Sequence, residues 1–199
     1  ASLLYTSGTT GRSKGAMITR GNLAFGAAAL AECWRFSPND VLLHALPVFH
    51  IHGLFLSANT VLAAGAGMIF LPRFDADEVI RWLPQASVMM GVPTYYTRLL
   101  KHPGLATAAK NLRLFVSGSA PLLAETHRAF QEKTGHAILE RYGMTETQVN
   151  TSNPYEGERR PGTVGMPLRG VELRVTALDG PGDAGREIAG PEAVGMIEI

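Results

Sequence analysis

Short apolar runs alternate with stretches of helical character along most of this chain, and this alternation constrains its fold more than any other feature. Runs suited to buried strands occupy residues 41–46, 68–71, 87–92, 112–116 and 137–142. Between them lie segments with helix-boundary residues, such as Pro93 at a first helical position and Gly135 at a helix end. Because strands alternating with helices form a parallel sheet with helices packed on it, the sequence predicts an α/β domain with a mostly parallel sheet and flanking helices.

Ligands of such sheets bind beyond the carboxyl ends of the strands. We therefore expect one crevice to be formed by the loops that follow residues 5, 46, 92, 116 and 142.

The pattern changes near residue 161. Val171, Leu173 and Val175 alternate with polar residues, and residues 179–190 are rich in Gly, Pro and charge. We therefore divide the chain into an α/β core at residues 1–160 and the beginning of a β-rich subdomain at residues 161–199.

Composition excludes several classes of function. The chain is 46% hydrophobic and 18% charged, which is typical of a packed domain and argues against disorder. A net charge of +1 indicates neither a nucleic-acid partner nor a membrane surface. The single cysteine, Cys33, cannot form an internal disulfide, so we expect a reducing compartment, either the cytoplasm or the mitochondrial matrix of a eukaryote. The expected partners are small molecules, and the oligomeric state is left open.

A segment rich in glycine and hydroxyl side chains follows the apolar residues 3–5. It reads Thr6-Ser7-Gly8-Thr9-Thr10-Gly11-Arg12-Ser13-Lys14-Gly15. Glycines let backbone N–H groups close around an anion, and the hydroxyls and two cations add donors and positive charge. The alternative is a polar surface turn, but this density of donors favours a phosphate loop. Its spacing differs from the nucleotide-triphosphatase P-loop, which has four residues between its first glycine and Gly-Lys.

A second segment, Tyr142-Gly143-Met144-Thr145-Glu146-Thr147, follows the last expected strand of the core. Its aromatic ring can stack on a purine, while Thr and Glu can bind a phosphate oxygen and Mg²⁺. Taken alone, Thr-Glu is also a common helix cap.

Together, the two segments resemble the signature motifs of the adenylate-forming superfamily, which contains acyl-CoA synthetases, luciferases and the adenylation domains of peptide synthetases. The resemblance covers almost the whole chain, including Gly118-Ser119-Ala120 and the segment at residues 160–165. It implies the central part of a large N-terminal domain that binds ATP, Mg²⁺ and a carboxylic acid, with CoA as co-substrate. It also implies an AMP-forming acid–CoA ligase of which these residues are a fragment. We expect the fragment to be inactive alone, because the adenylation lysine and the ribose-binding aspartate would lie beyond Ile199.

The resemblance also assigns roles to individual residues. The β- and γ-phosphates of ATP would contact Thr6, Ser7, Gly8, Thr9, Thr10, Gly11 and Lys14. The adenine pocket and α-phosphate site would use Gly118, Ser119, Ala120, Tyr142, Gly143 and Thr145. Glu146 would ligate Mg²⁺, and His50 would stand between ATP and the acyl group. The catalytic set is then Lys14, Thr145, Glu146 and His50.

The acid pocket is where this chain is distinctive. By the same register its lining comprises His50, Ile51, Leu54, Met90, Ser117, Arg141, Val149 and Asn150. Arg141 is either a solvated strand end or a guanidinium inside the pocket, where an unpaired charge would be costly. A second carboxylate on the substrate would pair with it. The wording of residues 140–147, with residues 150–152 and 49–53, resembles the members that convert malonate, ATP and CoA to malonyl-CoA, AMP and pyrophosphate through malonyl-adenylate.

Alternatives remain open at this point. Methylmalonate or another short- or medium-chain acid could replace malonate, whereas an amino acid is disfavoured because its ammonium group would face Arg141. From another class, the chain could be a nucleotide-binding module without activity. A zinc site at His50 and His52 is disfavoured because no Cys, Asp or Glu adjoins them, and His52 could be a core histidine.

Overall fold

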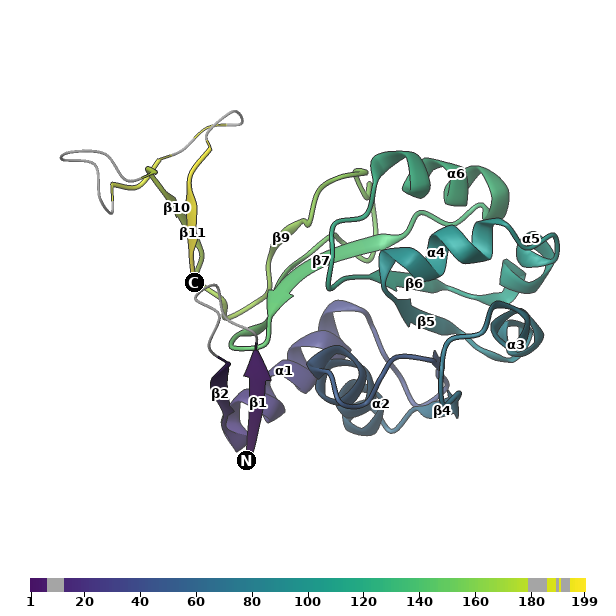
Figure 1. Ribbon diagram of the computed structural model, residues 1–199, viewed down its shortest axis with the longest axis horizontal. Helices are drawn as coiled ribbons and strands as arrows, with labels where there is room; N and C mark the ends of the chain where they lie inside the picture. The colour runs from purple at the N-terminus through teal and green to yellow at the C-terminus, as the bar shows by residue number, and fades with distance from the viewer. Residues whose placement is uncertain (7–12, 179–185, 189, 191–193) are drawn as a thin grey trace.

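A seven-stranded mixed sheet forms the centre of the molecule (Figure 1). The structure is a computed structural model, and it describes residues 1–6, 13–178, 186–188, 190 and 194–199. The sheet has the order β4-β3-β5-β6-β7-β8-β9. Its strands are β3 (Val41–His44), β4 (Gly67–Phe70), β5 (Val88–Gly91), β6 (Leu114–Ser117), β7 (Leu139–Met144), β8 (Gln148–Ser152) and β9 (Met166–Pro167). Strands β3, β4, β5, β6 and β7 pair in parallel, and β8 and β9 pair antiparallel. The predicted fold class is therefore confirmed.

Helices cover both faces of this sheet. They are α1 (Arg20–Cys33), a π-helix (His52–Ala58) that continues into α2 (Asn59–Ala64), α3 (Ala76–Trp82), α4 (Pro93–Leu100), α5 (Leu105–Ala108) and α6 (Ala124–Thr134). Short 3₁₀ turns follow at Leu83–Gln85 and Ala109–Asn111. Figure 1 shows α1 and α2 on one face and α3 to α6 on the other. Among the described residues, none of the helices has the length and apolar character needed to cross a membrane.

Local chemistry sets the helix ends. Thr19 caps α1 in a reciprocal capping box with Asn22. The Asp75 carboxylate accepts the first free N–H groups of α3, and Gly135 ends α6 in the left-handed conformation. Gly135 thus ends its helix where the sequence predicted.

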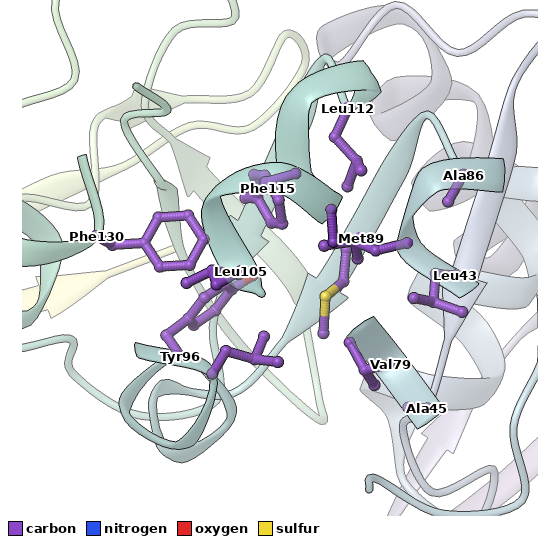
Figure 2. Packing of buried hydrophobic residues seen from close by; sticks show 14 of the residues in the cluster. Leu43, Ala45, Val79, Ala86, Met89, Tyr96, Leu105, Leu112, Phe115 and Phe130 are labelled. Atoms are coloured by element: carbon purple, nitrogen blue, oxygen red, sulfur yellow. The ribbon is translucent and has the colours of Figure 1, made fainter. Parts of the chain in front are cut away.

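Two apolar clusters, one on each face of the sheet, hold the layers together. The first, shown in Figure 2, packs the inner faces of α3 to α6 on the sheet. In it the Phe130 ring meets Tyr96 and Phe115 edge to face, with centroids 5.4 and 5.0 Å away. The second cluster packs Leu30 and Trp34 of α1 and Leu56 of the π-helix against the other face. Close packing on both faces fixes the strand ends from which the loops emerge.

The amino ends of three sheet strands are tied by one buried carboxylate. Asp40 Oδ1 and Oδ2 accept hydrogen bonds from Arg113 Nε and Nη2 at 2.7 and 2.9 Å, and Ser87 Oγ donates to Oδ1 at 2.7 Å. Burial opposes ionisation, but the hydrogen bonds from Arg113, Ser87 and Ser37 outweigh it and lower the pKa of Asp40 to about 2. This network lies at the end of the sheet opposite to the expected crevice.

Two small antiparallel sheets flank this core. One pairs β1 (Ser2–Thr6) with β2 (Lys14–Ile18), and the other pairs β10 (Arg174–Thr176) with β11 (Met196–Glu198). The glycine-rich segment therefore leads from β1 into β2, a strand that the sequence did not predict. The division of the chain at residue 160 stays a prediction.

Candidate functional site

A pocket of about 490 Å³, here called the main pocket, opens at the carboxyl ends of β3, β5, β6 and β7. Its lining is formed by Leu46, Pro47, His50, Ile51, His52, Gly53, Leu56, Val92, Tyr95, Ser119, Arg141, Gly143, Met144, Thr145 and Gln148. The loops after residues 46, 92, 116 and 142 thus converge, as the sequence predicted. The loop after residue 5 falls largely on residues 7–12, which lie outside the described residues.

A tight turn after β3 brings both histidines to the main pocket. Gly53 packs against the backbone of Pro47 so closely that a Cβ would lie 2.2 Å from the Pro47 carbonyl oxygen. Only glycine permits this approach, and it allows the π-helix to begin at His52 directly beside the turn. The side chain of His50 is exposed at the rim, and that of His52 is buried.

Arg141 on β7 is the dominant electrostatic feature of the main pocket. Its side chain is buried, and Nε and Nη2 have no hydrogen-bond partner among the described residues. No described carboxylate forms an ion pair with it. Burial lowers the pKa of Arg141 from its usual value to about 10, so it remains a cation at neutral pH. The interpretation of Arg141 as a solvated strand end is therefore wrong, and the pocket contains an unpaired buried charge.

The guanidinium of Arg141 packs against the loop that follows β6. A Cβ on Gly118 would lie 2.4 Å from Arg141 Cζ, so the absence of a side chain at this position makes room for the guanidinium.

His52 is held by the neighbouring residue of the same loop. Its Nδ1 is 3.0 Å from Ser119 Oγ, and its Nε2 has no partner among the described residues. Burial, and then the charge of Arg141, hold the pKa of His52 well below its usual value. His52 is therefore neutral at pH 7. It is not the fully satisfied core histidine that the sequence allowed.

The Thr145-Glu146-Thr147 segment forms the turn between β7 and β8, so its interpretation as a helix cap is wrong. Gly143 lies so close to β8 that a Cβ would be 1.8 Å from the Gln148 carbonyl oxygen. Thr145 lines the main pocket. Glu146 is exposed and lines a smaller neighbouring pocket of about 230 Å³.

The predicted phosphate loop is described only at its two ends. Thr6 and Lys14 face each other in the β1–β2 register, and the Lys14 side chain is exposed. The predicted contacts at Ser7, Gly8, Thr9, Thr10 and Gly11 lie outside the described residues.

Several other predicted site residues do not line the main pocket. Met90 and Val149 are buried in the second apolar cluster. Ser117 is buried on β6, with no partner for Oγ among the described residues. Tyr142 is half-buried, and Ala120 is exposed. Leu54 is exposed, and Asn150 lines a separate depression near residues 170–172.

Tyr95 and Gln148 line the main pocket but were not predicted to do so from the sequence. Tyr95 lies in the first turn of α4, two residues after Pro93. Its place just after the loop from β5 could have indicated that it faces the pocket. Gln148 enters because it occupies a left-handed backbone position after the β7–β8 turn, which the sequence does not signal.

Whether a metal ion can bind at this site depends on which carboxylate, histidine and cysteine side chains lie together. No group of three His, Cys, Asp or Glu side chains is gathered anywhere in the described part of the chain. Glu146 is an exposed carboxylate, and no hydrogen bond or ion pair joins it to the other described residues, which fits a Mg²⁺ ion held by one carboxylate together with substrate phosphates and water.

Comparison with known proteins places the chain in a family. The family model described as AMP-binding enzyme matches residues 1–197. The mitochondrial malonate–CoA ligase ACSF3 of Mus musculus is 43% identical over 194 residues, which are 88% of this chain and 33% of that protein. The chain thus spans about a third of the length of the curated relatives it matches.

Two solved structures extend this similarity. ATP-bound MatB from Rhodopseudomonas palustris is 56% identical with a TM-score of 0.93, over 98% of this chain and 38% of that one. A malonyl-CoA ligase in a product complex with methylmalonyl-CoA and AMP is 45% identical with a TM-score of 0.87, over 98% and 42% of the two chains.

Proposed function

The chain belongs to the family of AMP-binding enzymes, and from that premise we propose that the protein containing it makes malonyl-CoA from malonate, ATP and CoA. In the first half-reaction a carboxylate oxygen of malonate attacks the α-phosphorus of ATP, and the bond to pyrophosphate breaks. In the second, the CoA thiol attacks the acyl carbon of malonyl-adenylate, AMP leaves, and the thiol proton passes to solvent.

The observation that carries this proposal is the unpaired, buried cation of Arg141 in the main pocket. A buried guanidinium without a carboxylate costs several kcal/mol, roughly the penalty for an uncompensated buried ion. A monocarboxylic acid uses its only carboxylate in the reaction and cannot supply the missing partner. A dicarboxylic acid can, and its second carboxylate would accept charge-assisted hydrogen bonds from Nε and Nη2.

The lining of the main pocket also includes the apolar side chains of Ile51, Leu56 and Val92. Malonate is the smallest acid that separates two carboxylates by one carbon. Methylmalonate is the second candidate, because its additional methyl group would meet these apolar side chains.

The nucleotide would be held by the remaining predicted residues. Thr145 lines the same pocket as Arg141, so a phosphate oxygen at Thr145 would be close to the acid. Lys14 would place its ammonium group against the pyrophosphate, and Ser119 and Tyr142 would contact the base. Mg²⁺, when bound at Glu146, would neutralise phosphate charge that develops as pyrophosphate leaves. The chain's own contribution is positioning and charge, and no side-chain nucleophile is required.

Acid-dependent exchange of pyrophosphate into ATP tests this proposal directly. The protein containing these residues is assayed with malonate, methylmalonate, acetate, butyrate and glycine. We expect exchange with the two dicarboxylates and little with the others. Exchange that is strongest with a monocarboxylic acid would contradict the assignment, and no exchange with any acid would favour a nucleotide-binding module without activity.

A further inference from the structure

Two adjacent residues of the loop after β6 contact polar side chains that line the main pocket. Gly118 supports the Arg141 guanidinium, and Ser119 is hydrogen-bonded to His52 at 3.0 Å. The side chains of Arg141 and His52 are both at least nine-tenths buried, and both line the main pocket. One short loop therefore contacts both Arg141 and His52.

Ser119 occupies an unusual backbone conformation. Its φ is 69°, in the left-handed region that non-glycine residues seldom adopt. Such strain persists only where the surroundings enforce it, and it gathers at ligand sites. Here the conformation accompanies the hydrogen bond from the loop to the His52 ring.

The protonation of His52 follows from its neighbours. The charged and titratable groups that act on the ring are Arg141, His44 and His50, and burial adds to their effect. A second cation beside Arg141 is unfavourable, so the ring is neutral and carries one proton. The Ser119 hydroxyl can donate to Nδ1 or accept from it, according to the tautomer of the ring, and when it donates the ring proton is on Nε2. Nε2 is buried and has no partner in the described part of the chain.

We infer that His52, held by Ser119, is a second recognition group for the acid, with Nε2–H donating to the same distal carboxylate that Arg141 binds. This inference rests on the proposed function. A carboxylate has two oxygens with about four acceptor sites, so it can satisfy Arg141 and His52 together.

The test compares acids in the intact protein containing this chain. His52→Phe removes the donor and keeps a flat ring. We expect kcat/KM for malonate-dependent pyrophosphate exchange to fall roughly 10- to 100-fold, the scale for one hydrogen bond to a charged group. The change should appear mainly in KM for malonate, while exchange with butyrate and the affinity for ATP are retained. His52→Gln keeps an N–H donor and should recover part of the loss.

Ser119→Ala separates positioning from contact. It should weaken malonate selectivity less than His52→Phe, and its effect on this selectivity should disappear in the His52→Phe background, because Ser119 acts on the acid only through the ring. The matched control is His136→Gln. His136 is half-buried and lies before the amino end of β7, where its Nε2 is hydrogen-bonded to the Ala109 carbonyl oxygen. Its replacement should therefore not change selectivity.

Different failures are distinguishable. A wild-type protein without malonate-dependent exchange overturns both the proposed function and the role of His52. If Arg141→Met loses malonate selectively but His52→Phe does not, only the His52 inference is overturned. Equal losses for malonate and butyrate in His52→Phe also overturn it, because His52 would then serve the reacting carboxylate or the fold. A His52→Gln variant as impaired as His52→Phe contradicts a donor at Nε2.

Discussion

Replacing Gly118 by alanine should displace the Arg141 guanidinium without changing Arg141 itself. The added Cβ would lie 2.4 Å from both Cζ and Nε of Arg141, and 2.8 Å from Nη2. Carbon atoms in contact are about 3.5–4.0 Å apart, so the guanidinium has to move by roughly 1 Å. The backbone of Gly118 does not have a positive φ, so alanine is otherwise compatible with this position.

The size of the effect follows from that displacement. A shift of about 1 Å in a positioning group can cost about 10²-fold in rate. Complete loss of a buried charge pair costs about 2–5 kcal/mol, which is roughly 30- to 5,000-fold. We therefore expect Gly118→Ala to lower kcat/KM for malonate by about 10²-fold. Butyrate should be affected much less, because it has no second carboxylate for Arg141 to bind.

Pyrophosphate exchange with malonate and butyrate measures this in Gly118→Ala, Arg141→Met and the double variant. Methionine lacks the guanidinium that meets the new Cβ, so the double variant should be no worse than Arg141→Met. Two results would refute the reasoning. One is unchanged malonate kinetics in Gly118→Ala, and the other is losses that multiply in the double variant.

Two further predictions concern stability and the nucleotide site. The folded-state pKa of Asp40 is about 2 against 3.8 for the free side chain, so its contribution of about 2 kcal/mol is present above pH 3.8 and lost as the pH falls toward 2. Unfolding by urea between pH 5 and 2 should show this loss in the wild type and not in Asp40→Asn. At pH 7, Asp40→Asn should cost about 3 kcal/mol or more, because Arg113 loses its carboxylate. Equal pH dependence in the two proteins would contradict both statements. Lys14→Ala and Glu146→Ala should each slow pyrophosphate exchange by about 10²-fold with unchanged thermal unfolding, since both side chains are exposed. Normal exchange in either variant removes that residue from the site.

Much of the fold could be predicted because buried parallel strands leave a strong sequence signal. The residues of β5 and β6 are all buried, and most of them are apolar. Boundary residues such as Pro93 and Gly135 then placed the start of α4 and the end of α6.

Other elements had no comparable signal. Strand β2 has only five residues, and its pairing with β1 depends on a contact across the glycine-rich segment. The π-helix begins at His52, beside the close packing of Gly53 on Pro47, and neither feature has a signal in helix propensity.

The site was predictable where one strand end carries one motif. Arg141, Gly143 and Thr145 were all found from a single segment, because they follow the same strand into the same loop. The bond between His52 and Ser119 joins residues 67 positions apart, and nothing in either local sequence indicates it. The register that placed Met90 in the acid pocket did not anticipate that its side chain is buried, with Sδ accepting a hydrogen bond from Ser57 Oγ at 3.2 Å.

The most direct test of the central claim is the ratio of kcat/KM for malonate to that for butyrate, measured in the wild type and in Arg141→Met. If the buried cation selects the second carboxylate, the wild type strongly prefers malonate, and the substitution lowers this ratio by roughly 10²–10⁴-fold. Malonate activity should fall while butyrate activity is retained or rises, because an unpaired charge has left the pocket. Equal losses for the two acids, with the ratio unchanged, would make Arg141 a structural residue and would contradict the dicarboxylate assignment.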